Sequence, residues 1–155
     1  MAQFTLIPST EVSELTEEIR QIFEELASTL KPEQRVSGGE CHPAVDVFET
    51  DAAVEIVMDV AGLSPDAVRV VFRAGVVLIA GEKAAPTARQ PQTFHLVERE
   101  FGRFARAVRV NGAFDVKNSQ ATMRRGELTV RLPKRGDRRG VAHRVPVSAE
   151  PSGPA

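Results

Sequence analysis

The sequence predicts an all-β domain, an immunoglobulin-like β-sandwich, preceded by an amphipathic helical arm and followed by a flexible tail. Three observations support this fold class. Between residues 45 and 132, apolar and polar residues alternate in several short runs, the period of strands with one buried face. Turn residues such as Gly, Pro and Asn separate these runs. Before them, apolar residues recur every three or four positions, the period of a helix.

The N-terminal arm is predicted to cover residues 1–42. It begins with an apolar head, MAQFTLIP, after which Ser9 or Thr10 can cap a helix of about 20 residues that ends at Lys31-Pro32. Glutamates near the start of the helix interact favourably with its dipole. The stretch PEQRVSGGECHP, Pro32–Pro43, has no periodicity and is interpreted as a linker. The apolar stripe of the helix consists of Val12, Leu15, Ile19, Ile22, Phe23, Leu26 and Leu30.

Two interpretations of this stripe are open. It packs either on the domain of its own chain, or on other subunits or another protein. We favour the second interpretation, because the linker that follows the helix separates it from the β domain.

The β domain is predicted to cover residues 43–134. Its run Val76–Ala80 is apolar on both faces, so this strand is expected in the middle of a sheet, ending at Gly81-Glu82-Lys83. The closing hairpin, ATMRRGELTVRLPK, turns at Arg125-Gly126, where Gly126 can adopt a positive φ. Residues 84–93 are expected to form a loop. The remaining strands are expected around residues 45–49, 54–60, 68–73, 94–98 and 104–109.

Charge is distributed unevenly along the chain. Residues 1–51 carry eleven acidic and three basic side chains, whereas residues 52–155 carry ten acidic and seventeen basic ones. These opposed halves can attract one another within or between subunits, or they reflect an uneven polar surface. The basic stretch Lys134–Arg144 has no interleaved aromatic residues for base stacking, so no nucleic-acid partner is expected.

The sequence shows no signature of an enzyme, and we expect none. It has neither the GxxxxGK[ST] nor the GxGxxG phosphate-binding pattern, and no HExxH, CxxC or GxSxG motif. Its three histidines are scattered, so neither a metal nor another cofactor is expected. Cys41, the only cysteine, is interpreted as a spectator thiol in a flexible linker, with a redox sensor as the alternative. A lone cysteine, no signal-peptide pattern and no long apolar run indicate a soluble, cytoplasmic protein without a membrane partner.

Five segments of the β domain, taken in chain order, resemble the domain of one known family. The first three are PAVDVFETD (Pro43–Asp51), DVAGLSPDAVRV (Asp59–Val70) and VVLIAGEK (Val76–Lys83). They are similar to a first sandwich strand, to an Asp-Leu-Pro-Gly turn with Ala61 in place of Pro, and to a strand that ends in Gly-Glu-Lys or Gly-Glu-Arg.

The last two segments carry the closest resemblance. EREFGRFARAVRV (Glu98–Val110) is similar to a Glu-Arg-x-x-Gly-x-Phe-x-Arg strand, although Val110-Asn111 stands where Leu-Pro is usual. The closing hairpin is similar to Ala-x-x-x-Asn-Gly-x-Leu, with Arg125 in place of Asn. Together the five segments resemble the α-crystallin domain of the small heat-shock proteins. The departures concern turns and should leave the fold intact.

The resemblance implies an ATP-independent holdase, a chaperone that binds partly unfolded client proteins and prevents their aggregation. It also implies an oligomer built from dimers, so the expected partners are copies of this chain and client proteins. The arm is expected to bind clients, because its exposable apolar side chains can bury the apolar surface of unfolded proteins. The residues concerned are Phe4, Leu6, Ile7, Val12, Leu15, Ile19, Ile22, Phe23 and Leu26.

The resemblance also implies residues for assembly. The C-terminal extension, residues 135–155, contains Val145-Pro146-Val147, and Val145 and Val147 would anchor in an edge groove of a neighbouring subunit. The groove would be bordered by Val68, Val70, Phe72 and Thr122, although the first three could simply belong to the core.

The dimer contact would pair a short edge strand near Ala88–Gln92 with residues 45–49 of the partner. Arg106 stands where the family carries an arginine near this contact, although a plain surface arginine is the alternative. The residues implied in the dimer interface are Val45, Val47, Arg89, Gln92 and Arg106.

A second function class is left open, that of a co-chaperone or adaptor with a β-sandwich of the CS-domain type and no large assembly. The amphipathic arm and the Val-Pro-Val motif favour the holdase, since an adaptor needs neither. A cryptic hydrolase would require a pocket in which histidine and carboxylate groups converge.

Overall fold

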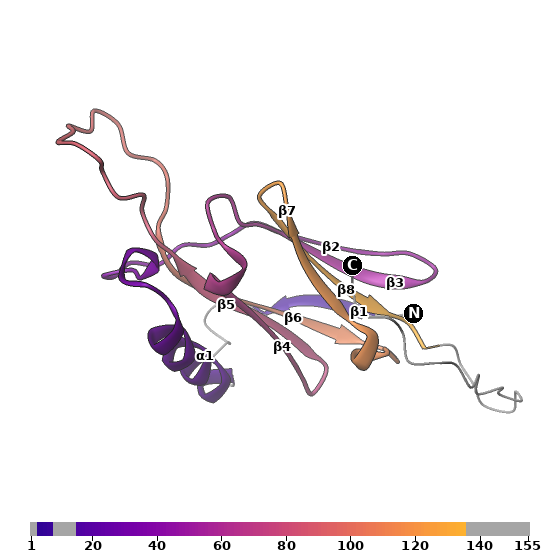
Figure 1. The fold of residues 1–155 in the computed structure, drawn as a ribbon. Coiled ribbons are helices and arrows are strands. Elements are labelled where there is room, and N and C mark those ends of the chain that lie inside the picture. The colour runs from indigo at the N-terminus through magenta and orange to yellow at the C-terminus, as the bar shows by residue number, and fades with distance from the viewer. Residues whose placement is uncertain (1–2, 8–14, 136–155) are drawn as a thin grey trace, which may run out of the picture.

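The computed structural model describes residues 3–7 and 15–135 of the chain. Within them, two four-stranded antiparallel sheets pack face to face, which confirms the predicted β-sandwich, and a helix lies on the outside of one sheet (Figure 1). The strands are Gln3–Ile7 (β1), Val45–Glu49 (β2), Ala53–Asp59 (β3), Val68–Arg73 (β4), Val76–Lys83 (β5), Gly102–Asn111 (β6), Gln120–Arg124 (β7) and Glu127–Pro133 (β8). The helix α1 is Thr16–Thr29, and short 3₁₀ turns cover Pro32–Gln34, Pro65–Ala67 and Val116–Asn118.

The main core lies between the two sheets. The first sheet has the strand order β1-β6-β5-β4 and the second has the order β2-β3-β8-β7. Alternate residues of each strand point into the space between them, so the core is built from aliphatic side chains at a period of two. Its buried members are Cys41, Val54, Ile56, Met58, Val60, Val68, Val77, Ile79, Phe104, Val108, Val110, Phe114, Leu128, Val130 and Leu132.

β5 is the central strand that its sequence predicts. It pairs with β4 on one side and β6 on the other, and all of its residues except Lys83 are buried. Val77 and Ile79 face the main core, whereas Val76, Leu78 and Ala80 face α1. The predicted stop at Gly81 is wrong, because Gly81 and Glu82 continue the pairing with β6, opposite Phe104 and Arg103.

Two further segments differ from the prediction. Residues 84–101 contain no strand, because β5 already has a neighbour on each side and β6 pairs with β5 and β1. β1 was not expected from the sequence. It adds to the edge of β6 in an antiparallel register that runs from Gln3 opposite Asn111 to Ile7 opposite Ala107.

Both tight hairpins turn through two residues with positive φ. At Arg125-Gly126 the φ values are 54° and 78°, and at Ala74-Gly75 they are 49° and 77°. Positive φ at both central residues is the type I′ turn, whose twist matches that of paired strands. The predicted turn and the positive φ of Gly126 are thus confirmed. Arg125 occupies a conformation that an ordinary side chain adopts at a cost.

Arg125→Asn is expected to stabilise the domain by about 0.5–1 kcal/mol, because Asn tolerates the left-handed conformation better than Arg does. The midpoint of urea unfolding measures this effect. Arg124→Asn, at the neighbouring strand position, is the matched control and should give no increase, since Asn is unfavourable in strands. A midpoint that does not rise in the Arg125 variant contradicts the expectation.

Candidate functional site

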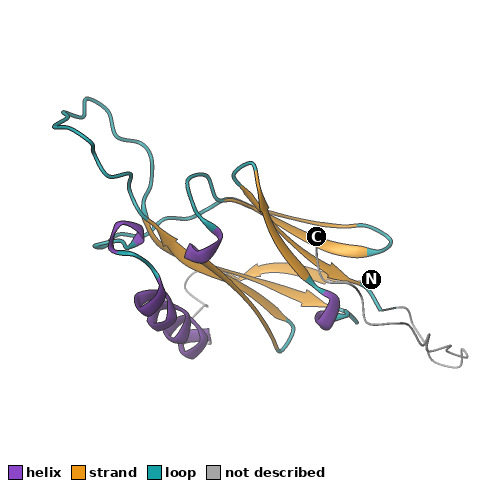
Figure 2. Cartoon of the chain, in the orientation of Figure 1, coloured by secondary structure: helices purple, strands orange, loops and turns teal. Residues whose placement is uncertain are grey.

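Helix α1 packs on the outer face of the first sheet of its own chain. Its residues Ile22 and Leu26 are buried, as is Leu30 directly after the helix, and they contact a second apolar cluster formed by Ala67, Val76, Leu78, Ala80 and Ala107. Figure 2 shows the helix on the side of this sheet that faces away from β2, β3 and β8. The interpretation we favoured, a stripe separated from its own domain, is therefore wrong for this structure, because the outer face of β5 is itself apolar and requires a cover.

Other predicted arm residues lie in different surroundings. Leu15, Ile19 and Phe23 are half-buried beside the same cluster. Leu6 lies in β1 and is 42% exposed, and Phe4 and Ile7 belong to the same strand. Val12 lies outside the described residues. The helix itself is described from Thr16, so its predicted cap at Ser9 or Thr10 also lies outside them.

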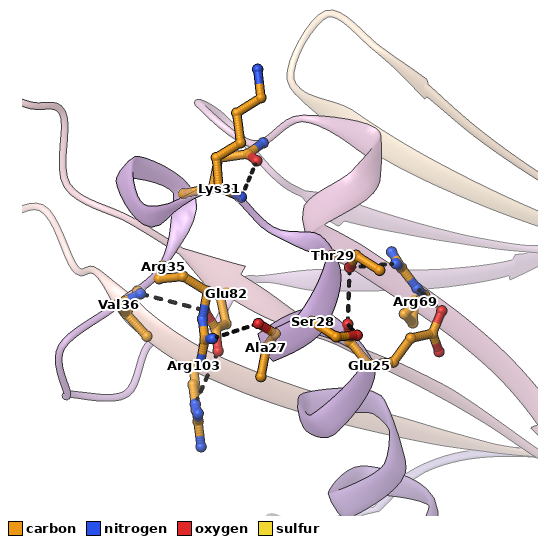
Figure 3. Close-up of polar contacts among 11 residues, drawn as sticks. Glu25, Ala27, Ser28, Thr29, Lys31, Arg35, Val36, Arg69, Glu82 and Arg103 are labelled. Atoms are coloured by element: carbon orange, nitrogen blue, oxygen red, sulfur yellow. Dashed lines mark hydrogen bonds and ion pairs between the residues drawn. The ribbon is translucent and has the colours of Figure 1, made fainter.

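Charged side chains border the helix where it meets β4. Glu18, which is buried, forms an ion pair with Arg73. Arg69 Nε donates to Glu25 Oε1 at 2.9 Å, and the same guanidinium donates to Thr29 Oγ1 at 3.4 Å (Figure 3). The acidic helix and the basic strand thus meet inside one chain, as the uneven charge distribution allowed.

Glu82 is a buried carboxylate that joins three parts of the chain (Figure 3). It accepts hydrogen bonds from Arg35 Nε at 3.0 Å, from Arg103 Nε at 3.2 Å and from the backbone N–H of Val36 at 3.3 Å. Arg35 also donates to the carbonyl of Ala27 in α1, at 3.2 Å. A buried charge is tolerated only when it is paired and hydrogen-bonded, and these donors meet that requirement.

The segment predicted as a free linker is attached to β6. The N–H of Cys41 donates to the carbonyl of Arg103 at 3.0 Å, and the N–H of Arg103 donates to the carbonyl of Gly39 at 3.1 Å. A side chain on Gly102 would place its Cβ 2.4 Å from backbone atoms of Gly39. The two backbone segments can approach this closely because both residues are glycine. The prediction of a flexible linker is wrong at this point.

Cys41 belongs to the main core and is 4% exposed, which does not agree with a thiol in a flexible linker. Its Sγ lies 3.5 Å from the carbonyl oxygen of Gly102, to which the thiol can donate. Burial raises the pKa of the Cys41 thiol above its ordinary value. Since the thiolate is the reactive form, the site disfavours oxidation and alkylation.

Alkylation of Cys41 by iodoacetamide at pH 8 is expected to be many-fold slower in the folded protein than in urea. Mass spectrometry of quenched samples measures both rates, and the denatured protein is the control. The pKa of the Cys41 thiol is higher in the folded protein than in the unfolded chain. The free energy of unfolding should therefore fall as the pH rises above the pKa of an unfolded cysteine. Equal alkylation rates in the two states would contradict the buried position of the thiol.

The implied anchor groove would involve β4 and β7, the edge strands of the two sheets. On β4, Val68 is buried in the main core, and Val70 and Phe72 are half-buried against it. On β7, Thr122 is exposed and lies with Thr129 and Arg131 around a polar depression on the outside of the second sheet. Thr122 thus faces away from the core, whereas its neighbour Met123 packs against it, and the place of Thr122 at a groove stays a prediction.

The implied dimer residues are spread over two regions. β2 pairs only with β3, so its second edge is open within the described residues, and Val45 and Val47 are half-buried against the main core. Arg89 and Gln92 are exposed in the segment 84–101, where the expected strand near Ala88–Gln92 is absent. Figure 1 shows this segment projecting away from the two sheets.

The projecting segment carries apolar side chains that sequence reasoning had placed in a strand. Phe94, Leu96 and Val97 are 69%, 75% and 68% exposed. The sequence predicted a strand around residues 94–98, whereas the structure has none there.

Arg106 faces the inside of the sandwich and is half-buried. Its Nη1 donates to the carbonyl of Pro43, directly before β2, at 2.7 Å. It is therefore not a plain surface arginine, although its role in a dimer stays a prediction.

Within residues 3–7 and 15–135, no group of three or more His, Cys, Asp or Glu side chains is arranged to hold a metal ion. The helices of that part are too short or too polar for any of them to cross a bilayer. Val145 and Val147, the implied anchor, lie outside the described residues.

Comparisons with known proteins bear on the domain as a whole. The model of the Hsp20/alpha crystallin family matches residues 46–148, more than half of the chain. The chain is 36% identical over 91 residues to the 17.4 kDa class I heat shock protein of Arabidopsis thaliana, which is 58% of each protein. It is 33% identical over 91 residues to the 22.0 kDa heat shock protein of the same plant, which is 58% of this chain and 47% of the relative. The chain thus spans about half the length of these curated relatives.

Solved structures show the same fold. A small heat-shock protein from Xylella fastidiosa aligns with 70% of this chain and 98% of its own, with a TM-score of 0.58 and 26% identity. The hspA protein of Xanthomonas axonopodis aligns with 60% of this chain and 93% of its own, with a TM-score of 0.55 and 29% identity. The two-sheet sandwich, the order of its sequence segments and the family match agree, and they show that the chain belongs to the Hsp20/alpha crystallin family of small heat-shock proteins.

Proposed function

We propose that this protein is an ATP-independent holdase that binds partly unfolded proteins and prevents their aggregation. Membership of the small heat-shock protein family implies a chaperone role, and family members are generally not enzymes. The observation that carries the proposal is apolar surface in two parts of the molecule. One part is the exposed set Phe94, Leu96 and Val97, and the other is the stripe of α1, which the first sheet covers in this structure. Unfolded clients expose similar surface, and its burial contributes about 25 cal/mol per Å².

The test is light scattering from a heat-aggregating enzyme, with and without this protein and with and without ATP. Suppression that rises with the molar ratio and is unaffected by ATP is the expected result. A variant that lacks residues 1–40 should lose the share of this protection that the arm itself supplies. Aggregation that continues unchanged at a molar excess of the full chain would exclude the holdase.

We further propose that the chain assembles from dimers into a larger homo-oligomer. Within the part of the chain that the structure describes, β2 and β4 each have one unpaired edge, which offers backbone groups to other chains. The related Xylella fastidiosa protein is described as having a distinct high-order structure. In this proposal, Val145 and Val147 anchor beside β4, between Val70 or Phe72 and Met123 of a neighbouring subunit.

The double variant Val145→Ala, Val147→Ala tests the anchor. Multi-angle light scattering after gel filtration should show the assembly reduced to dimers. Val141→Ala, in the same extension, is the matched control and should keep the native mass. An assembly of unchanged mass in the double variant would exclude the anchor role. If the wild-type protein is no larger than a dimer and does not protect clients, the adaptor is favoured instead.

The dimer contact is proposed between the segment 84–101 and the open edge of β2 on the partner. Its half-buried residues Val45 and Val47 lie at that edge. Phe94→Ser with Leu96→Ser should convert dimers to monomers if the exposed apolar residues make the contact. Arg89→Ser with Gln92→Ser, in the originally predicted strand, provides the comparison, and dimers that persist in both double variants would exclude this contact.

A cytoplasmic location is part of the proposal. The one cysteine is free and buried, and a chain without disulfides suits a reducing compartment.

A further inference from the structure

The outer face of the first sheet is a second apolar surface, separate from the core between the sheets. It carries Val71, Val76, Leu78, Ala80, Ala105 and Ala107, which α1 covers. The main core is a different cluster and draws its buried members from the strands and loops of the sandwich. The sandwich therefore does not need α1 to bury its own interior, and the helix can leave without opening the main core.

The contact between α1 and the sheet is incomplete. A 14-residue helix is marginal in water by itself, so α1 depends on the sheet for its structure. Ile19 and Phe23, on one side of the helix, are only half-buried. They line a cavity of about 640 Å³ together with Gly39, Phe104 and Ala105. Because this pocket opens to solvent, the two side chains are incompletely buried, and this side of the helix gains less from apolar burial.

Glu82 holds the helix and the segment after it to the sheet at one buried point. Through Arg35 it reaches the carbonyl of Ala27 at the C-terminal end of α1. Through Arg103, whose guanidinium lies 4.6 Å from the ring centre of Phe23, it reaches the middle of the helix. Figure 3 shows Arg35, Arg103 and Val36 converging on this one carboxylate from the linker and from β6. Loss of a buried partner leaves the remaining charges unpaired, so Glu82 is expected to contribute strongly to the attachment of α1 to the sheet.

We propose that α1 is a releasable cover, that Glu82 keeps it closed, and that its release exposes the outer face of β4, β5 and β6 as a client-binding surface. The proposal rests on the proposed holdase function and specifies where the client binds. In the closed state α1 occupies the place of the client, so the apolar stripe and the sheet face cover each other. On release, both become available.

The chemistry of the covered face specifies its occupant. It accepts the aliphatic side chains Ile22 and Leu26, and Arg69 and Arg73 at its border pair with the carboxylates of α1. The occupant is therefore an amphipathic segment of a partly unfolded client, with an aliphatic stripe flanked by acidic side chains. An apolar segment with basic flanks would meet the two arginines and bind less well.

Hydrogen exchange of the full-length variant Glu82→Gln tests the cover without any client. Gln keeps the shape of the side chain but removes the charge that pairs with both arginines. Since hydrogen bonds to charged groups are strong, exchange of residues 16–30 should become roughly ten- to hundredfold faster. Glu24→Gln is the matched control, because Glu24 is exposed and pairs with Arg20 of the same helix, and it should leave exchange near the wild-type rate.

The exchange of β8 decides how an accelerated helix is interpreted. Its rate should stay that of the wild type, because β8 belongs to the main core. If hydrogen exchange of β8 becomes faster by as much as that of the helix, Glu82 supports the whole fold and the proposed cover is overturned. If neither accelerates, Glu82 does not hold the helix and the cover is again overturned. Arg35→Gln, on a partly exposed partner of Glu82, repeats the measurement should Glu82→Gln not fold.

A cross-link tests whether clients need the cover to open. Glu25→Cys with Arg69→Cys, joined by a short bismaleimide, ties α1 to β4, and the buried Cys41 can stay in place. The same double variant capped with N-ethylmaleimide is the control. The cross-linked protein should protect a heat-aggregating client several-fold less than the capped protein, and equal protection overturns the covered face as a client site. If no form protects, wild type included, the holdase itself has failed, while the exchange result still stands.

Discussion

Ile56→Ala is expected to lower the free energy of unfolding by about 2–5 kcal/mol. Ile56 is fully buried in the main core, in the middle of β3, between β2 and β8. Its removal loses the transfer free energy of the deleted carbons and leaves a cavity that the two paired strands can hardly close. For a domain of this size, such a loss is a large fraction of the total stability.

Urea unfolding followed by circular dichroism measures the change. Val57→Ala is the matched control, since Val57 is the next residue on the same strand, faces outward and is half-buried. It should cost less than about 1 kcal/mol. Equal losses in the two variants would mean that β3 does not present Ile56 to the core.

Gly102→Ala is expected to cost about 2–4 kcal/mol, through two effects that add. The φ of Gly102 is 138°, where a side chain is strained. A Cβ would also lie 2.4 Å from the backbone of Gly39, so the segment before Cys41 would have to move away from β6.

Gly62→Ala separates the two effects. Gly62 has a φ of 81° but nothing within 4 Å of an added Cβ, so it should show the strain alone, about 1 kcal/mol. A local measurement complements the stability, because Cys41 should become reactive to a thiol reagent in the Gly102 variant. A Gly102 variant as stable as the Gly62 variant, with Cys41 still protected, would refute the close contact.

The period of the apolar residues was enough to predict most of the fold. β2, β3, β4 and β8 alternate clearly, and β5 is apolar on both faces, which correctly predicted its central position. The same observation contained the signal for α1, because a strand that is buried on both faces needs a layer on each side. The sequence-based interpretation did not combine the two facts, and so it separated the stripe of the helix from its own sheet.

What the sequence could not predict depends on contacts between distant segments. Gly-Gly at 38–39 is typical of a flexible linker, and only its close contact with Gly102 in β6 fixes this segment in place. β1 is a five-residue run that becomes a strand by adding to β6. Glu82 looked like the end of a strand, because the arginines that allow its burial lie 47 residues before it and 21 residues after it.

The pairing of β1 with β6 ties the order of synthesis to the completion of the first sheet. β1 leaves the ribosome before β6, because its partner residues, 107–111, are made about a hundred residues later. The first strand therefore waits unpaired while the rest of the sheet forms, which makes it a late and long-range contact. A truncation that removes the first residues also leaves the outer edge of β6 bare, and a bare edge invites pairing with other chains. Deletions of the arm thus change two properties at once, and substitutions within α1 are the cleaner way to separate client binding from edge protection.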